Sequence, residues 1–482
     1  MKTLLERKIS LVVIILQFLV SLLVCIYFGT TGLVPVKYMV AIAVVMVVLL
    51  VYQVMSQLTN SSYIFGRVLA VLFCAVFLVG ANYVRESMAA FQNVGGATKK
   101  VDVISFYVMK DDAAKTLADA KNYSFGILRQ QDRENTDKAV QDASKKLNKT
   151  LNTVEYDDPL TMVDALYAKE VQAIIMNKSF VDTVKSQYKT FSTDTRELDA
   201  SKIESEVEEL VDTDVTTKPF NVYISGIDVY GKIGQTSRSD VNIIATVNPV
   251  TKKVLLTSTP RDYYVPLSIS NGATDKLPHA GIYGIDVCMD TLGMLYDTSL
   301  DDYFRVNFAG FIKIIDALGG ITINSDYDFD SQNETGYHFN KGENHVNGEQ
   351  ALVFSRERYA FKEGDRQRGR NQMAVIQGVV DKVTQPSFLK NYLSVMDSLD
   401  GCFETNIPYD LIASLVRKQL DEGGSWQVLS YSVNGTGDTQ KPYSMSAKAY
   451  VMVPDQTTVD KAKVLMKKVR EGFQLSDADV AR

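Results

Sequence analysis

The chain contains few of the side chains that most catalytic and metal-binding sites use. Its 482 residues include four cysteines and three histidines, scattered along the sequence, which excludes a zinc site of ordinary ligand spacing. The sequence also has no Gly-x-Ser-x-Gly elbow, no His-Glu-x-x-His pair and no Walker loop. The common signatures of serine hydrolases, zinc proteases and P-loop nucleotide-binding proteins are therefore missing.

The chain likewise lacks an excess of positive charge. It has 51 Lys and Arg residues against 57 Asp and Glu residues, a formal net charge of −6. Proteins that bind nucleic acid usually present a basic field, so we expect no nucleic-acid partner. The length and the globular composition predict two or more domains.

Long apolar runs are concentrated at the N-terminus. Three of them approach the roughly 20 residues that a membrane-spanning helix needs, and we place these spans at about 9–28, 36–55 and 65–84. A cleavable signal peptide does not fit, since two further spans follow the first. Residues 1–86 are therefore predicted to form a membrane anchor of three transmembrane helices.

The basic residues around these spans predict the orientation of the anchor. Lys2, Arg7 and Lys8 precede the first span and Arg67 begins the third, whereas the opposite ends carry fewer basic residues. The positive-inside rule then places the N-terminus in the cytoplasm. We therefore expect a multi-pass protein of the cell membrane, with the bulk of the chain extracytoplasmic.

An extracytoplasmic location limits the chemistry. ATP is not available outside the cell membrane, so any phosphate group that this part of the chain binds must arrive on a lipid or on an exported substrate. Disulfides are also possible in such a compartment, and the sequence leaves open whether Cys288 and Cys402 pair.

The outer part of the chain divides into two α/β domains. Residues 98–203 alternate between strand-like and helix-like patterns, which predicts a small accessory α/β domain with a helix beginning at Ser179. Residues 204–218 are acidic and are read as a linker or a solvated helix. Residues 219–482 predict a larger mixed α/β domain, whose central sheet is flanked by helices.

Five arginines lie close together in the larger domain. Between Ser355 and Gln372 the sequence places Arg356, Arg358, Arg366, Arg368 and Arg370. These side chains would repel one another unless an anion lay between them, and the planar guanidinium fits a pair of phosphate oxygens. The alternative is a solvated helix face, because acidic residues lie among the arginines.

Other residues of this domain suit the same anion. Arg261 follows Pro260 at the end of a strand-like run, and Lys276 lies in a loop before a helix. Asp228 and Asp240 stand at the edges of apolar runs, where they could meet if the two strands are neighbours. Arginines with paired carboxylates suit a Mg²⁺–diphosphate site; the alternative is that both aspartates are ordinary turn residues.

The order of these motifs resembles that of the LytR–CpsA–Psr family. The resemblance rests on Gly226-x-Asp228, Arg238-Ser-Asp240, Pro260-Arg261-Asp262, Lys276, Arg356-x-Arg358 and Asp365-x-x-Arg368-x-x-x-Gln372. It implies a phosphotransferase outside the cell membrane. Such an enzyme moves a polysaccharide from a polyprenyl-diphosphate carrier to peptidoglycan and leaves a phosphodiester link. The three spans and the accessory domain resemble members that serve capsule biosynthesis, so the expected polymer is capsular polysaccharide, with capsule synthesis and export proteins as possible partners.

The resemblance also implies roles for individual residues. Asp228 and Asp240 match the positions that hold Mg²⁺ (or Mn²⁺), and a second group matches the positions around the diphosphate: Arg261, Lys276, Arg356, Arg358, Arg368 and Gln372. We expect Asp240 to act as base for a sugar hydroxyl, with Arg238 assisting and Arg261 stabilising charge.

Two other functions use the same residues. One is a regulator or scaffold of capsule synthesis that binds the lipid carrier without turning it over. The other is a pyrophosphatase that hydrolyses polyprenyl diphosphate and transfers nothing. The sequence does not separate transfer from hydrolysis.

Overall fold

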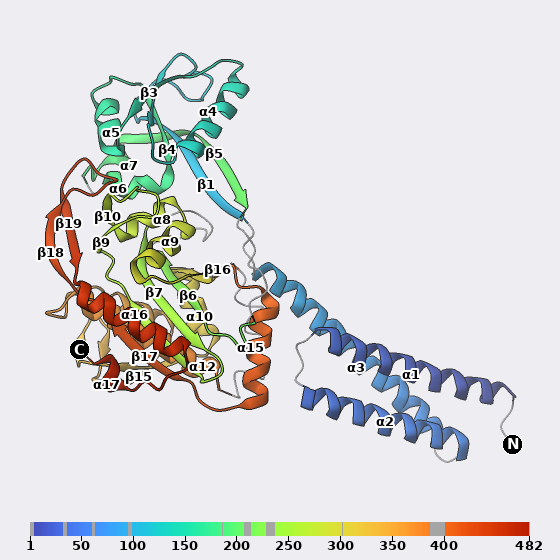
Figure 1. Cartoon of the computed structure of the whole chain (residues 1–482). Helices are drawn as coiled ribbons and strands as arrows, with labels where there is room; N and C mark the ends of the chain where they lie inside the picture. Colours follow the sequence, from blue (N-terminus) through green and yellow to red (C-terminus); the bar gives the residue numbers. More distant parts are fainter. Residues whose placement is uncertain are drawn as a thin grey trace.

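Figure 1 shows the computed structural model of the chain, a bundle of long N-terminal helices followed by two sheet-containing domains. The structure describes residues 4–31, 36–59, 63–94, 99–185, 187–206, 214–227, 237–300, 302–385 and 401–481. The mixed α/β fold class predicted from the sequence is confirmed.

The anchor consists of helices α1 (Leu4–Thr31), α2 (Val36–Thr59) and α3 (Tyr63–Val94). Each contains an apolar stretch long enough to cross a membrane, at Lys8–Gly29, Met39–Leu58 and Tyr63–Asn82, and the predicted spans lie within these helices. Arg67 joins all three, because its guanidinium donates to Ser10 Oγ at 3.1 Å and to Gln57 Oε1 at 3.2 Å.

The accessory domain contains a five-stranded sheet of order β3-β2-β4-β1-β5. Its strands are β1 (Lys99–Met109), β2 (Ser124–Leu128), β3 (Asn152–Tyr156), β4 (Ala173–Asn177) and β5 (Thr195–Glu206). Its helices are α4 (Arg133–Leu147), α5 (Pro159–Tyr167), the 3₁₀ turn η1 (Lys178–Phe180), α6 (Val181–Lys185) and α7 (Phe191–Asp194).

Two local predictions in this domain are wrong. Residues 204–206, predicted as the start of the linker or solvated helix, are the end of β5, because β5 pairs with β1 up to Glu206; Ile203 is buried, whereas its neighbours Lys202 and Glu204 are exposed. Ser179 does not cap a helix. Asn177 caps η1 instead, accepting a hydrogen bond from the Ser179 amide, and α6 follows.

The larger domain is built on a six-stranded sheet of order β16-β11-β6-β7-β8-β17. Strands β6, β7 and β8 run antiparallel to their neighbours in this group, whereas β11 pairs parallel with β6 and β17 parallel with β8. The strands are β6 (Phe220–Ile227), β7 (Ser239–Asn248), β8 (Lys253–Ser258), β11 (Asp302–Asn307), β16 (Phe403–Thr405) and β17 (Gln427–Ser432).

Helices cover both faces of this sheet. Helices α9 (Ile285–Tyr296) and α16 (Gln456–Arg470) pack on one face over strand residues such as Ile244 and Leu255. Helix α12 packs on the other face over Ile243 and Leu256. The helices on that side are α10 (Phe308–Ala317), α11 (Gly348–Arg356), α12 (Asp365–Val383) and α15 (Tyr409–Glu422).

Short elements complete the domain. They are β9 (Tyr264–Pro266), β10 (Thr274–Lys276), the 3₁₀ turn η2 (Leu277–His279), α8 (Ala280–Tyr283), β12 (Ile321–Ser325), β13 (Phe329–Asp330), β14 (His338–Phe339), β15 (Gly342–Val346), β18 (Gly435–Gln440), β19 (Ala449–Pro454) and α17 (Asp477–Val480). Neither Cys288 nor Cys402 forms a disulfide.

Candidate functional site

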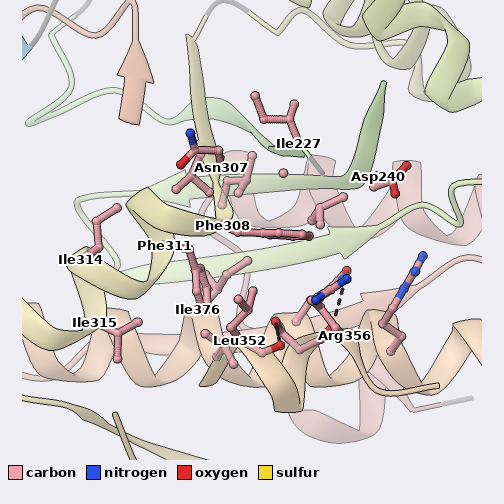
Figure 2. A pocket seen from close by; sticks show the side chains of 18 of the residues that line it. Ile227, Asp240, Asn307, Phe308, Phe311, Ile314, Ile315, Leu352, Arg356 and Ile376 are labelled. Carbon is pink, nitrogen blue, oxygen red and sulfur yellow. Dashed lines mark hydrogen bonds between the residues drawn. The ribbon is translucent and has the colours of Figure 1, made fainter. Parts of the chain in front are cut away.

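A cavity of about 440 Å³ lies between the six-stranded sheet and helices α10, α11 and α12 (Figure 2). Most of its lining is aliphatic or aromatic, from Ile224, Val241, Phe304, Val306, Phe308, Phe311, Ile314, Ile315, Leu352, Val375, Ile376 and Val379. Its charged lining comes from Asp240, Arg261, Arg356, Arg358 and Arg368. In Figure 2 Asp240 and Arg356 lie on one side and Ile314 and Ile315 on the other, so the cavity has a charged end and an apolar end.

A β-bulge places Asp240 at the charged end. Gly226 of β6 pairs with Val241, but the next residue, Ile227, pairs with Ser239. Asp240 is therefore the extra residue on β7. A bulge leaves one residue outside the ladder and changes the direction of its side chain. The side chain of Asp240 therefore leaves the regular alternation of β7 and faces the cavity.

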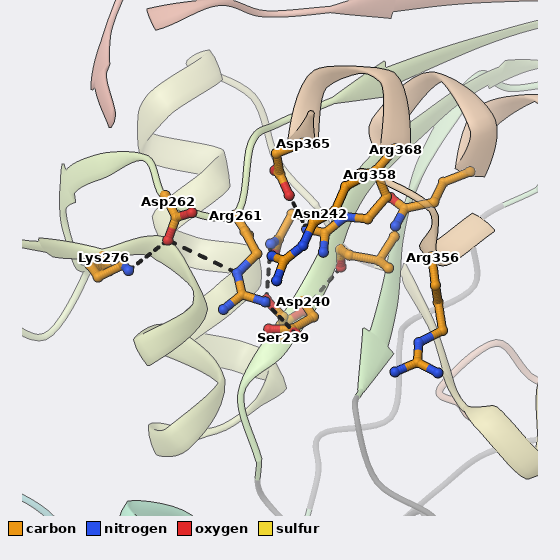
Figure 3. A network of polar contacts seen from close by, with 12 residues as sticks. Ser239, Asp240, Asn242, Arg261, Asp262, Lys276, Arg356, Arg358, Asp365 and Arg368 are labelled. Atoms are coloured by element: carbon orange, nitrogen blue, oxygen red, sulfur yellow. Dashed lines mark hydrogen bonds and ion pairs between the residues drawn. The ribbon is translucent and has the colours of Figure 1, made fainter. Parts of the chain in front are cut away.

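Arg261 and Asp240 form the central ion pair of the site (Figure 3). Arg261 Nη1 donates to Asp240 Oδ2 at 2.8 Å, and both side chains are about one-fifth exposed. Lys276 lies one step further away, with Nζ 2.6 Å from Asp262 Oδ1. Asp262 in turn lies 4.0 Å from Arg261 Nε. Lys276 thus reaches the site through Asp262 and does not line the cavity.

Arg356 and Arg358 both line the cavity. Arg356 ends α11, and its guanidinium carbon lies 4.4 Å from the centre of the Phe308 ring, within cation–π range. Its Nη1 is 3.4 Å from Glu334 Oε1. Arg358 lies against the ring of Tyr359, 4.6 Å from its centre.

The carboxylate between these two arginines holds the backbone of residues 358–360 in place. Glu357 is fully buried and accepts six hydrogen bonds of 2.7–3.1 Å. The donors are the Ser331 hydroxyl and the backbone amides of Gln332, Asn333, Arg358, Tyr359 and Ala360. Burial alone would raise the pKa of Glu357, but these hydrogen bonds lower it to about 2.

Helix α12 contributes Arg368 and Gln372 from its first turns, and both line the cavity. The Arg368 side chain is 12% exposed, with Nη2 2.6 Å from Asp365 Oδ1. Burial lowers the pKa of this guanidinium; Asp365 opposes that shift, and Arg261 adds to it. A buried arginine beside other arginines is a place where an anion would be stabilised.

The other two arginines of the run lie elsewhere. Arg366 donates to Asn434 Oδ1 at 2.9 Å, and Arg370 pairs with Glu363 and with Asp326, the latter at 3.3 Å. Neither residue lines the cavity. A solvated helix face is not observed either, since the side chains of Arg368 and Arg370 are only 12% and 20% exposed.

One predicted residue is separate from this group, and another lies outside the described residues. Arg238 is directed toward the accessory domain, where its Nη2 donates to Thr183 Oγ1 at 3.0 Å, and it does not line the cavity. Asp228 lies outside the described residues. Ile227, the residue before it, ends β6 and lines the cavity.

The charged end of the cavity fits a hard divalent cation in part. Asp240 offers a partly exposed carboxylate, the ligand type that Mg²⁺ takes together with phosphate oxygens and water. Among the described residues no group of three or more His, Cys, Asp or Glu side chains comes together. The donor set therefore suits an ion that a diphosphate would help to hold.

Sequence reasoning missed the cavity itself and the role of Glu357. The apolar lining has the composition of an ordinary core, and nothing in the sequence distinguishes the two. Glu357 carried a signal, an acidic residue between two arginines, but it supported only the alternative of a solvated helix face.

The profile of the LytR_cpsA_psr family matches residues 181–468. The chain belongs to the LytR–CpsA–Psr family. A second profile, that of a DNA polymerase processivity factor, matches residues 60–176. That stretch runs from the last transmembrane-length helix into the accessory domain and corresponds to no single folded unit.

Curated relatives in the LytR–CpsA–Psr family are wall-polymer transferases by name. The polyisoprenyl-teichoic acid–peptidoglycan teichoic acid transferase TagU of Enterococcus faecalis is 34% identical over 226 residues, 46% of this chain and 72% of the relative. TagU of Bacillus subtilis is 33% identical over 221 residues, 45% of this chain and 69% of the relative. For TagU of Bacillus licheniformis the match covers 61% of the relative.

Solved structures of the family also match. The crystal structure of B. subtilis TagV has a TM-score of 0.46 and 28% identity, covering 54% of this chain and 99% of that one. The structure of TagT bound to LI-WTA has a TM-score of 0.43 and 23% identity, covering 55% of this chain and 94% of that one.

Glu357→Gln should destabilise the protein in a pH-dependent way. Because the folded pKa of about 2 lies below the usual glutamate pKa of 4.5, the ionised carboxylate stabilises the fold above pH 4.5 and loses this effect as pH falls toward 2. Near pH 7 we expect the substitution to lower the free energy of unfolding by about 3 kcal/mol, measured by denaturant unfolding in detergent.

The difference between Glu357→Gln and the wild type should shrink as the pH is lowered from 5 toward 2. Glu363→Gln is the matched control, since Glu363 forms a partly exposed ion pair with Arg370 and should change stability by less than about 1 kcal/mol. A difference that does not depend on pH would contradict the assignment.

Proposed function

We propose that the chain transfers a phosphate-linked polysaccharide from a polyprenyl-diphosphate carrier to peptidoglycan, leaving a phosphodiester link. The observation that carries this proposal is one cavity with an apolar end and an arginine-lined end. A polyprenyl diphosphate has the same division, a hydrocarbon chain followed by concentrated negative charge. The names of the curated relatives support the same reaction class.

The apolar end of the cavity would hold the polyprenyl chain. Each methylene group removed from water contributes about 0.8 kcal/mol, so even part of the chain in the cavity gives substantial affinity. The diphosphate would then lie among Arg261, Arg356, Arg358 and Arg368, with Gln372 beside them. Four guanidinium groups neutralise its charge and orient the phosphoryl group for attack.

The transfer step is a displacement at phosphorus. A peptidoglycan hydroxyl oxygen attacks the phosphorus that carries the glycan, a new P–O bond forms, and the bond to the bridging diphosphate oxygen breaks. Polyprenyl monophosphate leaves with the electron pair. We assign the hydroxyl proton to the carboxylate of Asp240, and the stabilisation of charge on the phosphoryl oxygens to Arg261 and its neighbours.

We further propose that Mg²⁺ (or Mn²⁺) binds at the charged end, held by Asp240 and Asp228. When bound, the ion would supply additional neutralisation of the diphosphate charge. The Asp240 carboxylate would then bind the metal and Arg261 together, since one of its oxygens already accepts a hydrogen bond from Arg261. Arg261 would at the same time contact the substrate.

The N-terminal anchor bears on the proposed location of the catalytic domain, and the proposed polymer and partners complete the proposal. Three helices of membrane-spanning length precede the domains, and the basic residues at their predicted inner ends favour an extracytoplasmic catalytic domain. The polymer proposed is capsular polysaccharide, and capsule synthesis and export proteins are the proposed partners.

The decisive experiment supplies a labelled, lipid-linked polysaccharide with and without a peptidoglycan acceptor. Label joined covalently to the acceptor supports transfer. Release of free glycan phosphate at the same rate without acceptor would make the protein a pyrophosphatase. Binding of the lipid with no turnover would make it a scaffold or regulator.

Substitution of single cavity arginines should reduce turnover strongly. We expect Arg261→Ala, Arg356→Ala and Arg358→Ala each to lower kcat by about 10²–10³, the usual effect of losing one charge-stabilising donor. Arg370→Ala is the matched control, because Arg370 belongs to the same run but does not line the cavity. Equal activity in all four variants would remove the arginines from the mechanism.

Metal and lipid diphosphate should strengthen each other's binding. Calorimetric titration with geranylgeranyl diphosphate should give roughly tenfold higher affinity with Mg²⁺ than without it in the wild type. The two affinities should be equal in Asp240→Ala, which should also be inactive. An active Asp240→Ala enzyme, or no effect of Mg²⁺ on the wild type, would contradict the metal assignment.

Protease added to intact wall-less cells should digest the chain beyond about residue 86 and leave the anchor. The expectation follows from the basic residues around the spans. Lysed cells provide the control for complete digestion. Full protection of the outer domains in intact cells would place them in the cytoplasm and contradict both the topology and the transferase proposal.

A further inference from the structure

The accessory domain is joined to the catalytic domain through the short helix α8. Ile282 of α8 is 1% exposed and belongs to a hydrophobic core otherwise made of accessory-domain residues, including Met162, Phe180 and Val184. The ring of the next residue, Tyr283, packs edge-on against Phe180 with 6.0 Å between centres. The core of the accessory domain is therefore completed by a residue of the catalytic domain.

A second contact fixes the backbone of α8. The hydroxyl of Ser179 donates to the carbonyl oxygen of Ile282 at 3.3 Å. Ser179 belongs to η1, which leads directly into α6. The position of α8 thus depends on η1 and α6 of the accessory domain.

Helix α8 in turn lies directly against the chain that leads to Asp240. A Cβ atom on Gly281 would lie 2.4 Å from the carbonyl oxygen of Ser237 and 2.8 Å from the amide nitrogen of Ser239. Only glycine permits this approach without a shift of the backbone. The segment from Ser237 to Ser239 is thus held by α8 on one side.

Three side-chain hydrogen bonds also hold the same segment. Arg238 Nη2 donates to the hydroxyl of Thr183, a fully buried residue of α6. On the sheet side, the Ser239 hydroxyl lies 2.8 Å from those of Tyr223 and Ser225. The residue that follows is Asp240, which the bulge leaves outside the regular ladder of β7.

We propose that the accessory domain positions the carboxylate of Asp240, and that Thr183 is the positioning residue, acting through Arg238. A bulged residue has fewer ladder contacts to fix its direction, so the contacts of the preceding three residues determine where its side chain points. The inference rests on the proposed function in assigning the reacting centre to Asp240. It gives Arg238 an indirect role, through placement of its neighbour.

The first test compares three substitutions in the full-length protein in detergent, with the labelled lipid-linked polysaccharide and peptidoglycan as substrates. Thr183→Val keeps the shape and removes the hydroxyl, and Thr183→Ser keeps the hydroxyl. We expect Thr183→Val to lower kcat about 10–100-fold with little change in KM for the lipid, because displacement of a reacting group costs this much. Thr183→Ser should stay within about threefold of the wild type.

Thr136→Val is the matched control, a buried threonine changed in the same way. Thr136 lies in α4, whose buried alanines belong to the other accessory core, made of accessory-domain residues alone. Its activity should equal that of the wild type. Wild-type activity in Thr183→Val, or equal losses in Thr183→Val and Thr183→Ser, would overturn the proposal.

A double-mutant cycle tests directly whether Thr183 acts through Arg238. In the Arg238→Gln background, Thr183→Val should cause no further loss of kcat, whereas independent effects would add. Additive losses would overturn the proposal. A wild type that binds the lipid but transfers nothing would instead reject the proposed function, so the two failures are distinguishable.

Discussion

Repulsion among the guanidinium groups at the charged end of the cavity is the constraint on which the site depends. Arg261, Arg356, Arg358 and Arg368 line one small space, and burial of Arg368 makes its charge costly. The fold offsets this cost with carboxylates that pair with the arginines and leave the cavity open. Asp240 pairs with Arg261 and Asp365 with Arg368, while Glu357 accepts hydrogen bonds from the backbone amides of Arg358 and Tyr359. The arginines are thus held in place before any anion arrives, and little reorganisation is left for binding.

The sequence predicted the parts of this arrangement that depend on residue type and spacing. The positive charges at Arg356, Arg358 and Arg368 require either an anion between them or a solvated face. The length and apolar composition of the N-terminal runs indicate membrane helices. The family resemblance named Arg368 and Gln372 for the same site, and both line the cavity. The roles of the individual residues remain predictions, and Asp228 lies outside the described part of the chain.

The sequence could not predict what depends on strand register and on distant contacts. One extra residue in β7 turns Asp240 toward the cavity, but a bulge leaves no mark in the pattern of an alternating strand. Arg238 reads as part of the Asp240 motif, yet it bonds to a threonine 55 positions earlier in the chain. The strand at residues 204–206 was hidden by its two glutamates, since hydrogen bonding to β1 outweighs the weak preference of glutamate against strands.

The two faces of the catalytic-domain sheet are both apolar, but they pack differently. On one face, Ile244 and Leu255 join a continuous core with α9 and α16. On the other, Ile224 and Val241 border a cavity that side chains do not fill. Close packing of both faces would be more stable, because an unfilled apolar space forgoes dispersion contacts. The polyprenyl chain of the proposed substrate would complete the packing that α10, α11 and α12 leave unfinished. Binding of such a ligand and stability of this face would then be linked, since the same contacts serve both.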